Sequence, residues 1–238
     1  MLRRLFACPV CDNRLTRTQT VLGWLYMPMH FLVIPVLAAM FVYYAPGNYT
    51  DVTVNKIYFG VGIAFVLIAL GEWLRRNFYV LLDNPGRFAM CLAVGFAVDY
   101  LLSVAVTLAL MLIEGFGDNP NNAELMQMAD ADAGAMLGII VFLAPVVEES
   151  IFRGVVFGSI RRKSRVAAYA VSILLFALLH VWQYVVAYGD PWYFVYMLQY
   201  LPVSFVLAWL YERSGTIWTS IAFHMMFNAL SFYLLSIM

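Results

Sequence analysis

The sequence predicts an all-α polytopic membrane protein, a bundle of about seven transmembrane helices with its N-terminus in the cytoplasm. Of the 238 residues, 64% are hydrophobic and only 12% are charged, whereas about a quarter of the residues of a soluble domain are charged. The apolar residues also form runs of about 20, the length that a helix needs to cross a hydrocarbon layer about 30 Å thick. No polar stretch is long enough to form a separate soluble domain.

Seven apolar runs are the predicted spans, and they divide the chain into three parts. Residues 1–20 form an N-terminal cytoplasmic segment, residues 21–113 hold three helices, and residues 134–238 hold a core of four helices. The second run is the least regular, because glycines interrupt it and it ends at "GEWLRR". The predicted bounds of the spans are 21–44, 52–71, 88–113, 134–160, 166–188, 191–211 and 215–237.

The basic residues orient the bundle. Cytoplasmic loops are enriched in Lys and Arg, and with the N-terminus inside, 12 of the 14 basic residues lie in cytoplasmic segments. Lys56 lies outside and Arg153 lies within a span, while the outer loop 114–133 holds five acidic residues and no basic one. The twelve are Arg3, Arg4, Arg14, Arg17, Arg75, Arg76, Arg87, Arg161, Arg162, Lys163, Arg165 and Arg213.

The fourth span contains two carboxylates and a guanidinium in "EESIFR", and each bare charge at bilayer depth costs about 3 kcal/mol. Glu149 and Arg153 are four residues apart in the order that favours an ion pair. Glu148 points about 100° away from its neighbour and has no such local partner. Pro145 removes a backbone hydrogen bond and can bend the helix, and Gly154 begins a small-residue face that lets another helix approach.

Two later spans carry polar residues at the same spacing. His180 follows Phe176 by four residues, and Asn228 follows His224 by four. Counted at 1.5 Å per residue from the predicted cytoplasmic ends, Glu148, His180 and His224 lie on the order of 14–21 Å deep. Each group alone is explained by helix packing. Their common depth favours one water-filled site, because ionisable groups within spans usually mark functional positions.

These three motifs together resemble the CPBP family, the type II CAAX prenyl endopeptidases and their bacterial Abi relatives. The family pattern is EExxxR, then FxxxH, then HxxxN, on successive helices. Here it is matched by Glu148 to Arg153, by Phe176 to His180 and by His224 to Asn228. The resemblance covers roughly residues 134–237, while the first three spans carry no signature.

The resemblance implies an intramembrane endopeptidase that hydrolyses peptide bonds of membrane-associated or lipidated peptides, with the four-helix core as its catalytic part. By position, Glu148 would activate a water with the help of His180. His224 and Asn228 would stabilise the oxyanion of the tetrahedral intermediate, where each preorganised donor is worth roughly 3 kcal/mol.

Glu149 and Arg153 would then be a supporting pair that orients the site. Two histidines and a glutamate also resemble the His₂Glu zinc set of some hydrolases. No HExxH motif occurs, however, and each ligand would come from a different helix. We therefore expect no metal and no other cofactor, with zinc as the alternative.

Other polar residues are expected to have structural roles. "CPVC" at Cys8 to Cys11 is half of a zinc or redox motif that no second pair completes, so these thiols are taken as incidental. Cys91 and His30 are expected to pack within the bundle. Asp99, about 16 Å deep in the third span, is expected to form a hydrogen bond there, with a supporting role near the site as the alternative.

The expected partners are membrane lipid and a peptide or protein substrate with a membrane-associated C-terminus, and no nucleic acid. The expected location is the bacterial inner membrane. The sequence leaves open the natural substrate, its prenylation and the oligomeric state. A proton-coupled transporter or relay is an alternative function, since buried Glu and His also suit one, although no inverted repeat is evident. A non-catalytic bacteriocin-immunity protein of the same fold is another, and peptide cleavage distinguishes the enzyme from both.

Overall fold

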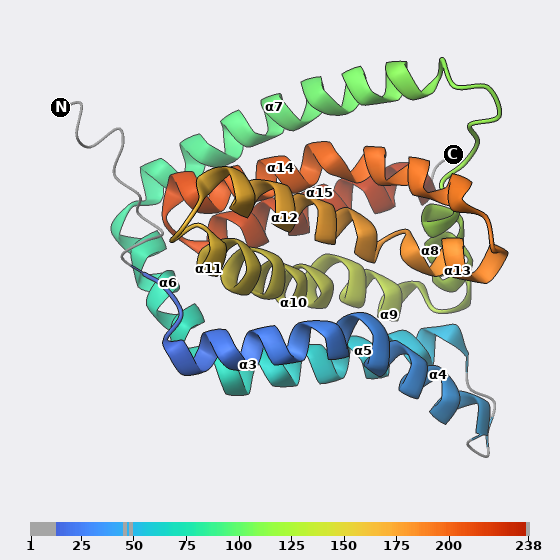
Figure 1. The fold of residues 1–238 in the computed structure, drawn as a ribbon, viewed down its shortest axis with the longest axis horizontal. Coiled ribbons are helices and arrows are strands. Elements are labelled where there is room, and N and C mark those ends of the chain that lie inside the picture. The colour runs from blue at the N-terminus through green and yellow to red at the C-terminus, as the bar shows by residue number, and fades with distance from the viewer. Residues whose placement is uncertain (1–12, 45–46, 48–49, 237–238) are drawn as a thin grey trace.

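The chain folds as an all-α bundle, seen in a computed structural model that describes residues 13–44, 47 and 50–236. Every regular element within these residues is a helix, which confirms the predicted fold class (Figure 1). In the first half of the chain the elements are α3 (Arg17–Pro28), η1 (Met29–Val33), α4 (Ile34–Tyr44), α5 (Asp51–Phe65), η2 (Val66–Leu70), α6 (Gly71–Asp83), α7 (Pro85–Leu110) and α8 (Pro120–Ala131).

The second half contains the three motifs and several short π-helical segments. Its elements are α9 (Ala133–Gly138), η3 (Ile139–Leu143), α10 (Ala144–Glu149), η4 (Ser150–Phe157), α11 (Gly158–Ile160), α12 (Arg165–Leu179), α13 (Trp182–Tyr188), η5 (Pro191–Tyr196), α14 (Met197–Ser214) and α15 (Ile217–Ser236). Of these, η3 and η4 are π-helical and η5 is a 3₁₀ helix.

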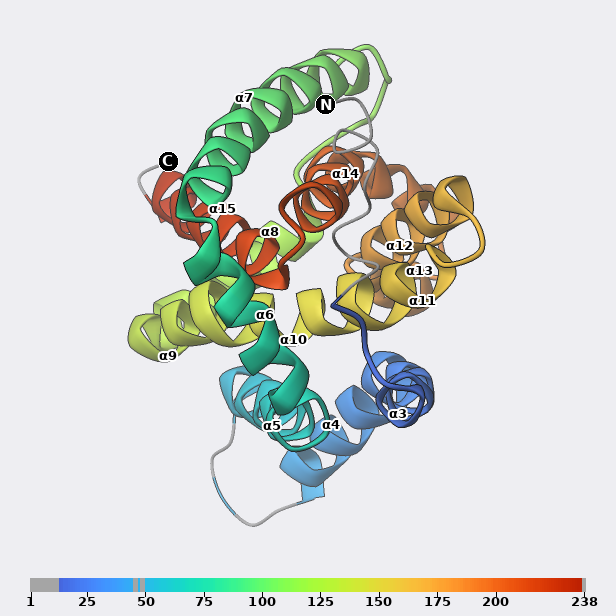
Figure 2. The ribbon, with the colours of Figure 1, turned by 90° about the vertical axis from the view of Figure 1, so that its left-hand side faces the viewer.

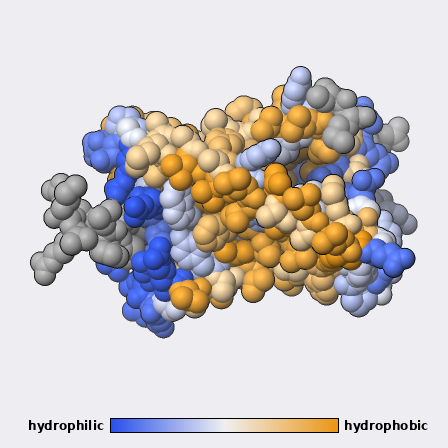
Figure 3. Space-filling view, turned by 90° about the horizontal axis from the view of Figure 1, so that it is seen from above, coloured by the Kyte–Doolittle hydropathy of each residue, from blue (hydrophilic) through white to orange (hydrophobic). Residues whose placement is uncertain are grey.

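Five continuous helices are long and apolar enough to cross a membrane, and the broken pair α12–α13 would make a sixth. An apolar belt separates two polar ends of the molecule (Figure 3). The chain is therefore a multi-pass integral membrane protein. The five continuous helices are Arg17–Tyr44, Asp51–Asp83, Pro85–Leu110, Ala133–Ile160 and Pro191–Ser214.

Three predicted spans differ from the structure. The helix predicted over 52–71 continues through α6 to Asp83. The span predicted over 166–188 is bent by 44° between α12 and α13, and the bend falls at His180 and Val181. The span predicted over 215–237 corresponds to α15, a helix of 20 residues that is not among the five. Polar side chains inside it, including His224 and Asn228, lower its hydropathy.

The helix that carries "EESIFR" lies at the centre of the molecule. In its most apolar stretch 61% of the residues are buried, against 17–44% for the other four spans. Seen from one end, it separates the layer of α3 and α5 from the layer of α12, α14 and α15, and α7 lies outermost (Figure 2). A charged group on this helix is therefore shielded from both lipid and bulk water.

Helix α6 crosses one end of the bundle, between the end of α5 and the start of α7 (Figure 1). Its Trp73 is fully buried and its indole N–H donates to the Asn13 carbonyl at 3.1 Å. A methyl group on Gly154 would lie 2.6 Å from Cη2 of this indole. The close approach predicted at Gly154 is therefore present, and the group that approaches is the Trp73 side chain.

Candidate active site

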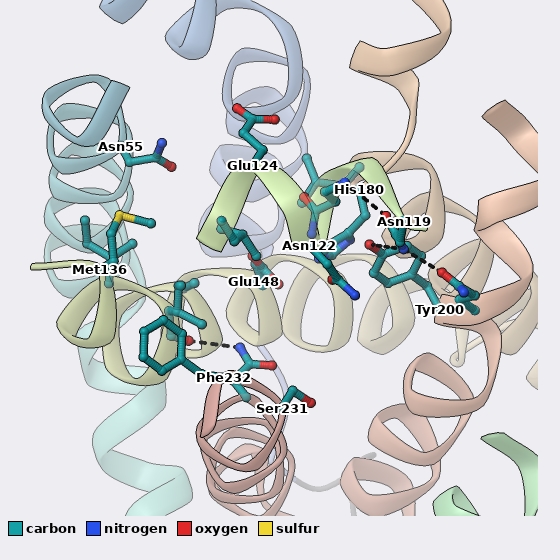
Figure 4. A pocket seen from close by; sticks show the side chains of 18 of the residues that line it. Asn55, Asn119, Asn122, Glu124, Met136, Glu148, His180, Tyr200, Ser231 and Phe232 are labelled. Carbon is teal, nitrogen blue, oxygen red and sulfur yellow. Dashed lines mark hydrogen bonds between the residues drawn. The ribbon is translucent and has the colours of Figure 1, made fainter. Parts of the chain in front are cut away.

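One cavity of about 780 Å³ brings together the four residues predicted to be catalytic. Glu148 comes from α10, His180 follows the last residue of α12, and His224 and Asn228 lie one turn apart on α15. Figure 4 looks into this cavity, with Glu148 and His180 among the labelled side chains. The similar depths inferred from the sequence thus correspond to a common location in space.

Glu148 is the carboxylate that faces the cavity. Only 6% of the residue is exposed, and its Oε2 has no hydrogen-bond partner among the described residues. This oxygen lies 3.9 Å from Nε2 of His224. A buried carboxylate oxygen without a protein partner can accept a proton from a molecule that enters the cavity.

Glu149 faces the other way and accepts three hydrogen bonds inside the protein. Its donors are Nη1 of Arg153 at 3.2 Å, Nδ1 of His224 at 3.0 Å, and the Ser220 hydroxyl. Arg153 also donates from Nη2 to the Ser204 carbonyl at 3.0 Å and to the Ser204 hydroxyl at 2.9 Å. Glu149 and Arg153 are both 0% exposed and do not line the cavity, so they can only act through their neighbours.

This contact fixes the orientation of the His224 ring. A carboxylate only accepts hydrogen bonds, so Nδ1 of His224 carries the hydrogen that points to Glu149. Nε2 then faces Glu148 and the cavity. When the ring is protonated, Nε2 also becomes a donor, and the Glu149 carboxylate stabilises the positive charge.

His180 also directs Nδ1 toward an acceptor of the protein. Its Nδ1 lies 2.9 Å from the Phe176 carbonyl, and a carbonyl only accepts, so Nδ1 donates and Nε2 of the neutral ring is an acceptor. Its ring stacks on Tyr200 with centroids 4.5 Å apart. Because α12 ends at Leu179 and the chain bends there, the ring is held where the helix is broken.

Phe176, the first residue of the FxxxH motif, packs against the charged and aromatic side chains of the site. The Arg153 guanidinium lies 4.5 Å from the centroid of its ring, a favourable cation–π contact. The same ring meets Phe152 edge-on at 5.4 Å and His224 at 5.7 Å. An aromatic residue at this position therefore connects the supporting ion pair to both histidines.

Asn228 is anchored by an unusual feature of the central helix. Its Nδ2 donates to the Ile140 carbonyl at 2.9 Å. In the π-helical segment η3, the Ala144 N–H bonds to the carbonyl five residues back, at Ile139. In that register residue 145 would bond to Ile140, but Pro145 has no N–H. The predicted loss of a backbone hydrogen bond at Pro145 thus leaves a carbonyl that can hold Asn228.

Comparisons with known proteins identify the region that carries these residues. Residues 131–230 match the model of the "Rce1-like" family, described as "Type II CAAX prenyl endopeptidase Rce1-like". Residues 131–230 are therefore the part of the chain that is similar to this family. This confirms the resemblance predicted from the three motifs, and the matched region contains all six of the predicted catalytic and supporting residues.

Two bacterial proteins are similar to this chain. "UPF0177 protein YxdF" of Lactococcus lactis is 33% identical over 132 residues, which cover 56% of this chain and 66% of that protein. "Putative membrane peptidase YdiL" of Bacillus subtilis is 29% identical over 116 residues, which cover 48% of this chain and 43% of that protein. The chain thus spans less than two thirds of the length of either relative. No solved structure matches the chain.

Several residues that hold the side chains around this cavity were not predicted from the sequence. Ser220 precedes His224 by four residues on α15, so its helical spacing could have indicated that it shares a face with His224 and Asn228. Ser204 and Tyr200 on α14 belong to no motif, and their contacts with Arg153 and His180 arise only from packing.

The remaining sequence candidates that the structure describes do not line the cavity. His30 is fully buried, with Nε2 2.7 Å from the Tyr58 hydroxyl and Nδ1 3.4 Å from the Tyr26 hydroxyl, as expected of a packing residue. Asp99 is 5% exposed and does not line the cavity. Its Oδ1 has no hydrogen-bond partner among the described residues. Cys91 is buried as expected, whereas "CPVC" lies outside the residues that the structure describes.

Within residues 13–44, 47 and 50–236, no group of three or more His, Cys, Asp or Glu side chains is arranged to hold a metal ion.

Proposed function

We propose that this chain is an intramembrane endopeptidase that hydrolyses peptide bonds with a water activated by Glu148. The observation that carries the proposal is the partnerless Oε2 of Glu148, which faces a cavity that His180, His224 and Asn228 also line. The similarity of residues 131–230 to the Rce1-like family and the relative named a membrane peptidase support the same class of reaction.

In the first step, Glu148 takes a proton from water while the water oxygen attacks the carbonyl carbon of the substrate. The neutral His180 accepts a hydrogen bond at Nε2 from the second O–H of this water, which stays on the oxygen, because its Nδ1 is already a donor to the protein. A carbon–oxygen bond forms, and the substrate carbonyl oxygen becomes an oxyanion.

His224 and Asn228 stabilise this oxyanion. His224 donates from Nε2 in its protonated form, which Glu149 holds in place through Nδ1. Asn228 donates the amide hydrogen that does not bond to the Ile140 carbonyl. Glu148 then returns its proton to the nitrogen of the leaving group, the carbon–nitrogen bond breaks, and a carboxylic acid and an amine are released.

The substrates of this reaction are peptides associated with or anchored in a membrane, because the cavity lies among membrane-spanning helices. The location that we propose is the bacterial cell membrane, and both similar proteins described above are bacterial. The binding partners are then lipid and such peptides.

The test is cleavage by protein purified in detergent, with mass spectrometry to detect new termini in a mixture of apolar peptides. Glu148→Gln should lower cleavage at least 100-fold, the usual contribution of a general base, without changing membrane insertion. Glu72→Gln is the control, since this glutamate is exposed on α6 and pairs with the exposed Arg75. Equal cleavage by Glu148→Gln and the wild type would reject the mechanism. Uptake into proteoliposomes that requires Glu148, without proteolysis, would favour the transporter alternative.

A further inference from the structure

Carboxamide side chains line the cavity around the proposed catalytic residues. Besides Asn228, the cavity is lined by Asn55, Asn119, Asn121, Asn122, Gln183 and Gln199. They come from α5, from α8 and the residue before it, from α13 and from α14. Asn119 donates to Oε1 of Gln199 at 2.6 Å and to the Tyr200 hydroxyl at 3.0 Å, which ties the start of α8 to α14 (Figure 4).

A carboxamide presents the same donor and acceptor groups as a peptide bond. A cavity wall rich in Asn and Gln can therefore pair with the N–H and C=O groups of an extended backbone at several points, without requiring a charge on the ligand. Apolar residues such as Phe31, Met136 and Phe227 line the remaining surface and suit the side chains of an apolar segment.

The charged side chains that line the cavity are carboxylates, and neither Lys nor Arg is among the described lining residues. The carboxylates are those of Glu124 and Glu148. Glu124 is exposed and accepts a hydrogen bond from the Tyr184 hydroxyl.

The guanidinium of Arg153 does not line the cavity. It is buried and paired with Glu149. The nitrogen-bearing ionisable side chains that line the cavity, among the described residues, are the imidazoles of His180 and His224, so a ligand carboxylate would lose its water without gaining a permanently charged cation.

The cavity lies toward the end of the bundle opposite the arginine-rich one. Helix α8, which contributes Glu124, covers that end (Figure 1). Lys56, the basic residue that the sequence places on this side, does not line the cavity and pairs with Asp132 at 3.0 Å. Because the arginine-rich end is cytoplasmic by the positive-inside rule, the cavity faces the non-cytoplasmic side.

We infer that the cavity binds an internal, uncharged or positively charged peptide segment presented from the non-cytoplasmic side, and that it excludes a free C-terminal carboxylate. The inference rests on the proposed function for the cleavage step only, since the access and charge of the cavity are measurable without proteolysis. It implies that the scissile bond lies well upstream of the end of the substrate.

The first experiment measures access and charge by thiol labelling. Ser231, which lines the cavity, is replaced by cysteine in a chain with Cys8→Ser and Cys11→Ser, and the buried Cys91 is retained. Intact cells are treated with the cationic trimethylammonioethyl or the anionic sulfonatoethyl methanethiosulfonate. Corrected for their rates with a free thiol in water, the cationic reagent should react about tenfold faster.

Charge variants assign this preference to the cavity. Glu124→Gln should lower the cation-to-anion ratio severalfold, whereas Glu114→Gln, an outer carboxylate that does not line the cavity, should leave it unchanged. Equal corrected rates for the two reagents, or labelling confined to inside-out vesicles, would overturn the inference.

The second experiment compares peptides with one scissile sequence and different ends. With the bond three residues from the C-terminus, a C-terminal amide should give a kcat/KM at least tenfold above that of the free carboxylate, and a longer C-terminal extension should remove the difference. Equal values for the short amide and carboxylate peptides, or a preference for the carboxylate, would overturn the inference. If the wild type cleaves no peptide, the proposed function fails, and the labelling ratio alone decides this inference.

Discussion

The neighbouring Glu148 and Glu149 should lose very different amounts of stability on the same substitution to glutamine. Glu149 is 0% exposed and accepts hydrogen bonds from Arg153, His224 and Ser220. Replacing it by glutamine removes the negative charge and turns an amide hydrogen toward one of these donors. Removing one partner of a buried ion pair costs about 3–5 kcal/mol, so Glu149→Gln should lose about that much stability.

Glu148→Gln is the matched control, because the chemical change is the same and lies one residue away. Oε2 of Glu148 has no hydrogen-bond partner among the described residues, so this variant should lose less than about 1 kcal/mol. The assay is thermal unfolding in one detergent at pH 7, followed by tryptophan fluorescence. At about 2–4 °C for each kcal/mol, Glu149→Gln should unfold about 10 °C below the wild type and Glu148→Gln within a few degrees of it.

Both variants should be inactive for different reasons, the first because His224 is no longer held and the second because the base is absent. The reasoning would be refuted if Glu149→Gln unfolded with the wild type, or if Glu148→Gln lost as much stability as Glu149→Gln. Either result would mean that Glu149 does not have a supporting role distinct from the catalytic role of Glu148.

Further predictions concern catalysis, packing, charge and metal. His180→Gln should lower kcat about 100-fold at nearly unchanged melting temperature, and an unchanged kcat would contradict its role. Gly154→Ala would place Cβ 2.6 Å from Trp73 and should cost about 1–3 kcal/mol of stability. Gly138→Ala, whose Cβ would meet no neighbouring group within 4 Å, should cost nothing. A lower melting temperature for Gly138→Ala than for Gly154→Ala would contradict the packing. Glu212→Gln removes the negative charge and replaces by an NH₂ donor one of the two oxygens that accept from three side chains. It should cost about 2 kcal/mol and less in high salt, as melting at two salt concentrations would show. Chelation should leave cleavage unchanged; loss of activity that zinc restores would establish the metal-dependent alternative.

The composition and spacing of the chain were sufficient to predict the fold class and to find the site. Runs of apolar residues predict spanning helices, because a backbone in lipid must satisfy its hydrogen bonds internally. The motif residues Glu148, His180, His224 and Asn228 could be placed at one depth, since the helical rise is constant. The structure gathers them at a single cavity.

Other features of the site could not be read from local sequence. The bend after His180 and the register of η3 that leaves the Ile140 carbonyl for Asn228 depend on which backbone groups find partners elsewhere. Ser204 and Tyr200, which hold Arg153 and His180, lie in α14 and carry no local pattern.

The sequence by itself determined that this chain lies in a membrane and which polar side chains are too costly there to be incidental, because transfer into lipid depends on residue type and helix length alone. Only the tertiary structure decided which of two adjacent glutamates faces the cavity, which nitrogen of each histidine donates, and which charges the cavity lacks. Those properties depend on the partners that other helices bring within hydrogen-bonding distance, and neighbours in space need not be neighbours in sequence.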